Sequence, residues 1–232
     1  MTAGRLLLWR HGRTAYNAEA RLQGQVDIPL DDVGRWQART AAARMLERHE
    51  PTHVVASDLE RAAQTARYLG RAADLEVVLD TRVRERAFGE WEGLTGDEIS
   101  ARWPDDFALW RAGGEPSRVG AESRALVAER MAAGIAEHAA ALGRDDTLVV
   151  VSHGAAISSA VGELLGMEPA WRGIVGMLNA HWAELVSSSA AGQAPWRLAG
   201  YNLGPTDASS DWNAGPDSVH GSDADAQTRD PA

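Results

Sequence analysis

Residues 5–12 of the chain, Arg-Leu-Leu-Leu-Trp-Arg-His-Gly, decide its fold. The apolar run 6–9 is typical of a strand that is buried on both faces, and it leads directly into Arg10-His11-Gly12. Open α/β sheets bind their ligands at the carboxyl ends of the strands. A histidine at that end, beside a guanidinium and a glycine that permits a tight turn, is a candidate nucleophile for an anionic substrate.

A second strand ends in the same pattern. Residues 147–151 form the clearest buried strand of the chain, and Ser152-His153-Gly154 follows it. Because the carboxyl ends of parallel neighbours lie at one edge of a sheet, we expect His11 and His153 to face each other across a pocket. A single histidine is more often an ordinary core or surface residue, but two matching strand ends favour a functional site.

Two arginines and an asparagine can complete a site for an anion. Arg10 and Arg61 each carry a planar guanidinium fork that fits phosphate oxygens, and nearby helix starts add backbone N–H groups. Asn17 offers an uncharged donor. Plainer interpretations stay open, with Arg61 as one more exposed helix arginine and Asn17 as a turn residue.

Strands and helices alternate along the chain. We expect strands at 6–9, 53–56, 76–79, 147–151, 180–187 and 196–202, and the main helices at 32–50, 57–69, 123–142 and 154–165. Ser57-Asp58 can cap the second of these helices, and Thr95 with Glu98 has capping-box spacing before a short helix that Pro104 interrupts. This order predicts an α/β fold, a three-layer sandwich with a mostly parallel central sheet and helices on both faces.

Composition predicts one domain followed by a tail. The chain has 232 residues, of which 44% are hydrophobic, and we expect a single domain over residues 1–204. Residues 205–232 are rich in Asp, Ser, Gly, Pro and Ala, with Trp212 and Val219 as their large apolar residues, which predicts a disordered acidic tail. The net charge of −10 argues against nucleic acid or an anionic membrane as a partner.

Two missing residue types narrow the chemistry. The sequence contains no cysteine, which excludes disulfides, thiol catalysis and thiolate metal sites, and no lysine, which excludes lysine-based catalysis. We find no charged leader followed by an apolar stretch, and no apolar run as long as a membrane span. We therefore expect a cytoplasmic protein.

Four spaced motifs resemble those of the histidine phosphatase (phosphoglycerate mutase-like) superfamily. They are Arg10-His11-Gly12-x-Thr14-x-x-Asn17, Ser57-Asp58-Leu59-x-Arg61-Ala62-x-x-Thr65-Ala66, Arg84-Glu85-x-x-x-Gly89 and Ser152-His153-Gly154. The resemblance covers roughly residues 5 to 203 in order. It implies a phosphatase or mutase whose nucleophilic histidine becomes phosphorylated.

The resemblance assigns a role to each matching residue. It implies that His11 becomes phosphohistidine, that Arg10, Arg61 and His153 hold the phosphoryl oxygens with help from Asn17, and that Glu85 protonates the leaving alkoxide. Two arginines and a protonated His153 can stabilise the developing charge without a metal or cofactor. A plainer interpretation of Glu85 is a surface acid in a loop that also holds Glu90 and Glu92.

The sequence favours a phosphatase over a mutase. Mutases of the superfamily retain a second phosphate with a basic lid containing lysine and paired arginines. The matching stretch 95–120 has only Arg102, Arg111 and Arg118, which are scattered. The sequence is also compatible with a broad-specificity phosphatase and, outside enzymes, with a catalytically silent module that binds a phosphorylated ligand.

Within the phosphatase branch, further stretches resemble the glucosyl-3-phosphoglycerate phosphatases. They are residues 21–25, 89–95, 179–182 and 196–202. This resemblance implies a small phosphorylated substrate and a homodimer, with Gln23 in contact with the phosphate or glycerate and the chain near Leu198 closing the pocket. The sequence assigns no role to Arg13.

Overall fold

A computed structural model describes residues 2–168, 170–188, 194–205 and 210–215. The helices are α1 (Ala15–Ala18), α2 (Asp32–Leu46), α3 (Glu60–Ala73), α4 (Gly96–Arg102), α5 (Pro104–Arg111), α6 (Arg124–Ala140) and α7 (Gly154–Leu164). The strands are β1 (Arg5–Arg10), β2 (His53–Ala56), β3 (Val77–Leu79), β4 (Thr147–Ser152), β5 (Trp182–Ser187) and β6 (Trp196–Leu203). The predicted alternation of strands and helices is confirmed.

The six strands form one sheet in the order β3-β2-β4-β1-β5-β6. Strands β3, β2, β4 and β1 pair in parallel, whereas β5 pairs antiparallel with both β1 and β6. Five strands therefore run in one direction and β5 runs against them. The predicted mostly parallel sheet is confirmed, and its two central strands are β1 and β4.

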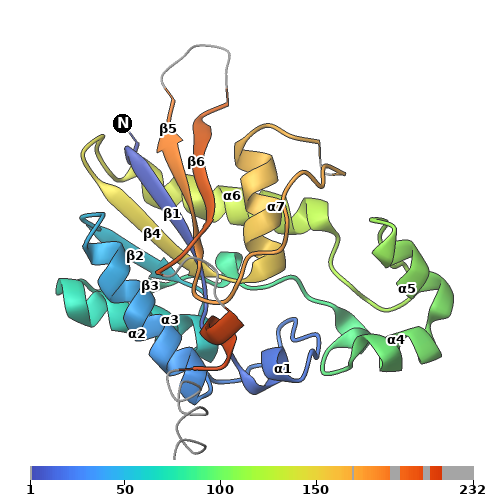
Figure 1. Ribbon diagram of the computed structural model, residues 1–232. Coiled ribbons are helices and arrows are strands. Elements are labelled where there is room, and N and C mark those ends of the chain that lie inside the picture. The colour runs from blue at the N-terminus through green and yellow to red at the C-terminus, as the bar shows by residue number, and fades with distance from the viewer. Residues whose placement is uncertain (1, 169, 189–193, 206–209, 216–232) are drawn as a thin grey trace, which may run out of the picture.

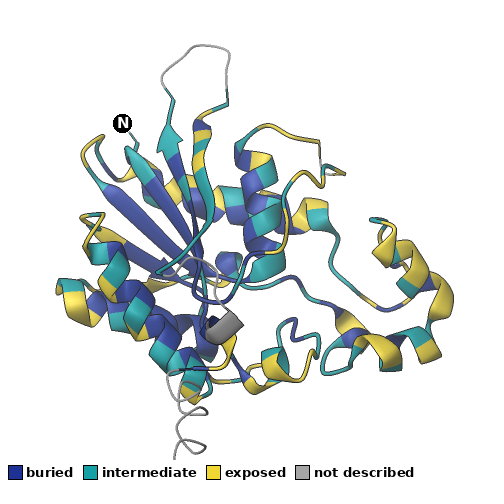
Figure 2. Cartoon of the chain, viewed as in Figure 1, coloured by how far each residue is buried: buried dark blue, intermediate teal, exposed yellow. Residues whose placement is uncertain are grey.

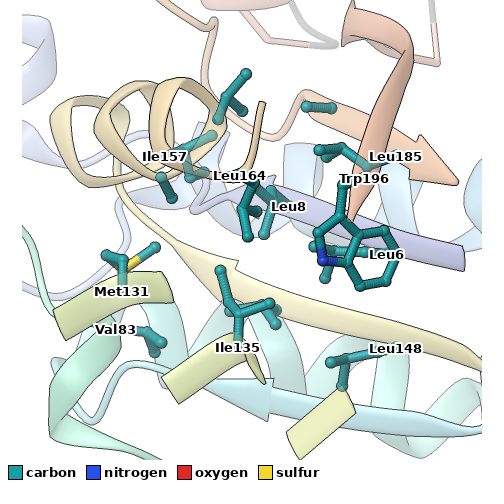
Figure 3. Packing of buried hydrophobic residues seen from close by; sticks show 14 of the residues in the cluster. Leu6, Leu8, Val83, Met131, Ile135, Leu148, Ile157, Leu164, Leu185 and Trp196 are labelled. Carbon is teal, nitrogen blue, oxygen red and sulfur yellow. The ribbon is translucent and has the colours of Figure 1, made fainter. Parts of the chain in front are cut away.

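Helices cover both faces of this sheet (Figure 1). Along β1, Leu6 and Leu8 pack against α6 and α7, whereas Leu7 and Trp9 pack against α2 and α3. Strand β4 alternates in the same way and is buried along its whole length. Figure 3 shows the α6 and α7 side of this core, where Met131 and Ile157 belong to the same cluster as Leu6 and Leu8. A strand with hydrophobic side chains on both faces requires this three-layer arrangement.

Helices α4 and α5 lie to one side of the sheet and expose much of their surface (Figure 2). Thr95 and Glu98 form the predicted capping box at the start of α4. Pro104 does more than interrupt a helix, because it occupies the first position of α5, where its missing N–H has no intrahelical partner to lose. A small aromatic cluster built on Phe88 and Trp91 packs beneath the two helices.

Two local expectations differ from the structure. Helix α3 begins at Glu60 after Leu59, and no side chain caps it. Asp58 instead forms an ion pair with Arg84, and Ser57 accepts a hydrogen bond from the backbone N–H of Leu59. Helix α2 ends at Leu46, four residues before the expected Glu50.

The C-terminal region also differs in part from the predicted disordered tail. A short 3-10 helix forms at Ser210–Asn213, and Trp212 is only 2% exposed. It packs with the α2 and α3 side of the core, so a single tryptophan is enough to dock this segment. The remainder of the predicted tail, residues 206–209 and 216–232, lies outside the described residues.

The sequence predicts no membrane-spanning segment, and the length and apolarity of the helices bear on this expectation. Among the residues that the structure describes, none of the helices combines the length and apolarity needed to cross a bilayer.

Candidate active site

The two predicted histidines meet at the centre of the sheet edge. Strands β1 and β4 are in register, with Arg10 opposite Ser152, so the next residue of each strand is a histidine. The chain leaves β1 toward α2 on one face and leaves β4 toward α7 on the other face. This divergence makes a crevice where open α/β sheets bind ligands. The ring centroids of His11 and His153 are 5.1 Å apart.

His11 has one ring nitrogen available for attack. Its Nδ1 lies 2.6 Å from the carbonyl oxygen of Gly12, and because a carbonyl only accepts, Nδ1 carries the proton. Burial, Arg61 and Arg10 lower the pKa of His11 well below its ordinary value. The ring is therefore neutral near pH 7 and Nε2 keeps its lone pair, which is the state that a nucleophile needs.

The loop after His11 is held by its backbone. The N–H of Gly12 donates to Oγ1 of Thr65 at 3.1 Å, and that hydroxyl donates to the carbonyl of Arg61 at 2.7 Å. A Cβ on Gly12 would lie 2.4 Å from the carbonyl oxygen of Gly34, so only glycine fits against α2 here. The nucleophile loop is thereby packed between α2 and α3.

Arg61 orients His153. This arginine is fully buried, and its Nε donates to Nδ1 of His153 at 3.2 Å while its other nitrogens donate to the carbonyls of Val26 and Gly24. Burial lowers the pKa of Arg61 to about 10, which still leaves it cationic at neutral pH. The interpretation of Arg61 as an exposed helix arginine is therefore wrong.

The protonation of His153 differs from the sequence expectation. Its Nδ1 accepts a hydrogen bond from Arg61, so a neutral ring carries its proton on Nε2. Burial, followed by Arg61, His11 and Arg10, lowers the pKa of His153 well below 6.5. Two guanidiniums beside the ring disfavour a second positive charge, so His153 is a neutral hydrogen-bond donor here and not the protonated group that we expected.

Arg10 lies beside the histidine pair. One of its terminal nitrogens donates to the carbonyl of Met177, and its side chain passes over Gly154 at the start of α7. Burial lowers its pKa, and electrostatic interactions with Glu85 and Tyr201 act in the opposite direction. Tyr201 was not singled out from the sequence, because its neighbourhood depends on the pairing of β6 with β5.

Buried donors remain available for a ligand in this pocket. Nε of Arg10 and Nε2 of His153 are both buried, and neither has a hydrogen-bond partner among the described residues. Buried donors of this kind are normally satisfied in native proteins. An anion bound between the rings of His11 and His153 has several acceptor oxygens and would accept a hydrogen bond from each of these two donors.

The carboxylate of Glu85 lies at the first turn of α7, which is the helix that follows His153 in the chain. Its carboxylate accepts hydrogen bonds from the backbone N–H groups of Ala155, Ala156 and Arg86 at 3.2, 2.8 and 2.8 Å. The other two acids of its loop are placed differently: Glu90 is exposed, and Glu92 accepts from the loop backbone. Glu85 is thus the acid that the fold brings to the crevice.

Arg130 on α6 holds the Glu85 loop in place. Its guanidinium donates to the carbonyls of Arg82, Arg84 and Glu85 at 2.7 to 2.9 Å, and it also pairs with Glu122. Sequence reasoning missed this residue. An arginine inside an alanine-rich helix gives no local signal that it reaches three carbonyls elsewhere in the chain.

Asn17 and Gln23 both lie near the nucleophile loop. Oδ1 of Asn17 accepts from the backbone N–H of Thr14, and Asn179 also donates to it at 3.2 Å. Gln23 accepts from the Thr14 hydroxyl at 2.9 Å and is 8% exposed. The capping box of α1 therefore accounts for the contacts between Asn17 and Thr14, as the turn-residue interpretation suggested. The NH₂ group of Asn17 makes no hydrogen bond to the described residues.

Leu198 is not brought to the site. It pairs with Leu185, which pairs with Leu6 on β1, five residues before His11. At about 3.3 Å per strand residue, Leu198 is level with a point about 16 Å from the nucleophile. It packs on the α6 and α7 side of the core instead, so the expected pocket contact is wrong for this chain.

Two further residues support the nucleophile from behind. Asn179 donates to the carbonyl of His11 at 3.1 Å as well as to Asn17. Arg13, which had no assigned role, pairs with Asp31 at 2.8 Å and donates to the carbonyl of Asn213. Arg13 therefore connects the nucleophile loop to Asp31 and to the backbone of Asn213.

The fold and this geometry define a histidine phosphatase. A family model for the histidine phosphatase superfamily (branch 1) matches residues 6–198, and the chain belongs to that family. Among the described residues, no group of three or more His, Asp or Glu side chains is arranged to hold a metal ion.

Three proteins illustrate which members of this family the chain is similar to. A glucosyl-3-phosphoglycerate phosphatase from Mycobacterium tuberculosis is 41% identical over 87% of this chain and 96% of its own. A solved structure of mycobacterial glucosyl-3-phosphoglycerate phosphatase with VO3 is 39% identical, covers 86% of this chain and 99% of its own, and has a TM-score of 0.78. A probable phosphoglycerate mutase from Enterobacter sp. (strain 638) is 37% identical over 69% of this chain and 74% of its own.

Proposed function

We propose that this protein hydrolyses the phosphomonoester of glucosyl-3-phosphoglycerate, releasing glucosylglycerate and phosphate through a phosphohistidine intermediate. The observation that carries the reaction class is the pair of imidazoles 5.1 Å apart, one with a free lone pair and the other with an unpartnered donor. The substrate rests on relatives about 40% identical over most of the chain.

In this mechanism Nε2 of His11 attacks phosphorus and forms an N–P bond while the P–O bond to the substrate breaks. Arg10, Arg61 and Nε2–H of His153 bind the equatorial oxygens, where the negative charge develops. Glu85, in its protonated form, gives its proton to the leaving alkoxide. It then takes a proton from water, which attacks the phosphohistidine and releases phosphate.

The lid chemistry favours hydrolysis over phosphoryl transfer back to a product. Arg118 pairs with Asp106 at 2.9 Å, so one of the three arginines between residues 95 and 120 is already neutralised. The other two, Arg102 and Arg111, are exposed. A mutase must hold a second phosphate during its cycle, and this lid offers no paired cations for that purpose.

The His11→Ala variant tests the reaction class. We expect it to stop phosphate release from p-nitrophenyl phosphate in metal-free buffer and to remove acid-labile phosphate from the protein during turnover. Near wild-type release by this variant would overturn the mechanism. Folded wild-type protein with no turnover would support the phospho-ligand-binding module instead.

A substrate panel tests the specificity. We expect kcat/KM for glucosyl-3-phosphoglycerate to exceed that for 3-phosphoglycerate by more than about tenfold, a difference of about 1.4 kcal/mol in transition-state binding. Comparable values would indicate a broad-specificity phosphatase. Formation of 2-phosphoglycerate in the same reaction would indicate a mutase.

We also propose that the protein is a cytoplasmic homodimer, as its resemblance to the glucosyl-3-phosphoglycerate phosphatases implies. A light-scattering mass of twice the 24.9 kDa chain would support the dimer, and a monomeric mass would contradict it. Cell fractionation tests the compartment.

A further inference from the structure

Residues 210–215 lie directly behind the nucleophile loop. Trp212 is 2% exposed, its ring centroid is 5.0 Å from that of Trp36 on α2, and its ring meets that of His181 edge to face at 5.6 Å. A buried tryptophan of this size contributes a large apolar contact and also needs a partner for its N–H. Trp36 and His181 provide the apolar contact, and Asn179, which also contacts His11, accepts the hydrogen bond from the N–H.

The first connection runs through Asn179. Nε1 of Trp212 donates to the carbonyl oxygen of Asn179 at 2.9 Å. The side chain of the same asparagine donates to the carbonyl of His11 at 3.1 Å and to Oδ1 of Asn17 at 3.2 Å. Trp212 is therefore two hydrogen bonds away from the backbone of the nucleophile.

The second connection runs through Gln37, whose side chain is fully buried. Its Nε2 donates to the carbonyl oxygen of Trp212 at 2.8 Å, and its Oε1 accepts from the backbone N–H of Arg13 at 2.9 Å. Arg13 in turn donates to the carbonyl of Asn213. The loop after His11 is thus tied to the same segment from its other side.

Trp212 makes no hydrogen bond to Arg61 or His153, and it reaches Asn17 only through Asn179. Arg61 and His153 are held by α3, β4 and residues 24–26, none of which Trp212 bonds to. Replacement of Trp212 by alanine removes the ring and the N–H that donates to the carbonyl of Asn179, whereas the backbone carbonyl that accepts from Gln37 remains. Without the ring to dock it, this carbonyl would move away from the buried amide of Gln37. The loop could then shift while Arg61 and His153 keep their positions.

We propose that residues 210–215 form a C-terminal brace that positions the His11 loop for attack on phosphorus, and that Trp212 is its main positioning residue. This inference rests on the proposed function for its kinetic readout. Since displacement of a reacting group by about 1 Å costs up to 10²-fold in rate, the brace should act on kcat.

The test uses the full-length chain with Trp212→Ala, Trp212→Phe and Trp196→Phe. Trp196 is the matched control, because it is 4% exposed but lies at the opposite end of the sheet, paired with Ser187. We expect kcat to fall about tenfold in Trp212→Ala and about threefold in Trp212→Phe, which keeps a ring but loses the N–H donor. KM and the dissociation constant for inorganic phosphate should change less than about twofold, and Trp196→Phe should keep the wild-type kcat.

Hydrogen exchange gives a readout that does not depend on turnover. We expect the backbone amide of Arg13 to exchange at least about tenfold faster in Trp212→Ala than in wild type or Trp196→Phe. Unchanged kcat in both Trp212 variants, or unchanged exchange at Arg13, would overturn the brace. If the wild type releases no phosphate, the proposed function fails, and the exchange experiment still decides whether Trp212 holds the loop.

Discussion

Acidification should destabilise this protein through the buried histidine pair. His11 and His153 are 2% and 0% exposed, and burial with the nearby Arg61 and Arg10 lowers both pKa values well below 6.5. In the unfolded chain both rings take up protons as the pH falls through 6.5. The unfolded state then binds more protons than the folded state, so stability falls with pH below that point.

The expected loss follows from the unfolded state. At pH 5.5 each free imidazole gains about 1.4 kcal/mol from protonation, compared with about 0.2 kcal/mol at pH 7. With two rings that stay neutral in the folded protein, the free energy of unfolding should decrease by about 2.5 kcal/mol between these pH values, as an upper estimate. Urea denaturation in buffers free of phosphate and other divalent anions measures it.

A matched pair of variants isolates the effect. The double variant His11→Gln/His153→Gln should lose the share of the pH dependence between 7 and 5.5 that the pair contributes, about 2.5 kcal/mol, whereas His53→Gln, at an exposed position, should keep the wild-type slope. His49 and His181, whose pKa values burial also lowers, are present in every protein compared and cancel. If the double variant and wild type give parallel curves, the histidine pair is not neutral in the folded state.

Three further substitutions test the site. Glu85→Gln should slow phosphate release by about 10² to 10⁴-fold with unchanged phosphate affinity, and a wild-type rate would remove its role as acid. Arg130→Ala frees three carbonyls of the Glu85 loop and should lower kcat at least about tenfold, which steady-state kinetics would detect. Gly12→Ala places a Cβ 2.4 Å from a carbonyl oxygen and should cost at least about 1 kcal/mol in urea denaturation, whereas Gly176→Ala, with open space around it, should not.

The buried strands were predictable because their signals are local. Leu6 to Trp9 can be satisfied only with helices on both faces, and the His-Gly pairs at 11 and 153 follow such strands directly. Parallel pairing then places the two histidines at one edge. The contact expected near Leu198 came from the family resemblance and not from the strand pattern, and the position of Leu198 depends on the register of an antiparallel pair at the far side of the sheet.

The protonation states and the supporting residues depended on tertiary contacts. His153 is a neutral donor because Nε of Arg61, from another helix, points at its Nδ1. Arg130 donates to carbonyls that lie 45 to 48 residues away in the sequence. Neither fact has a trace in the local sequence, since desolvation and hydrogen bonding belong to the assembled site.

The sequence by itself determined the layered α/β fold, the family and the histidine and arginine pairs at the sheet edge, because strand burial and short motifs are written in neighbouring residues. Only the tertiary structure decided which acid reaches the crevice, which imidazole keeps its lone pair, and that Trp212 docks behind the nucleophile. Composition predicted disorder for that segment, and the physical reason for the difference is that the buried ring of Trp212, its N–H bond to Asn179 and the bond from Gln37 to its backbone carbonyl outweigh the polar neighbours.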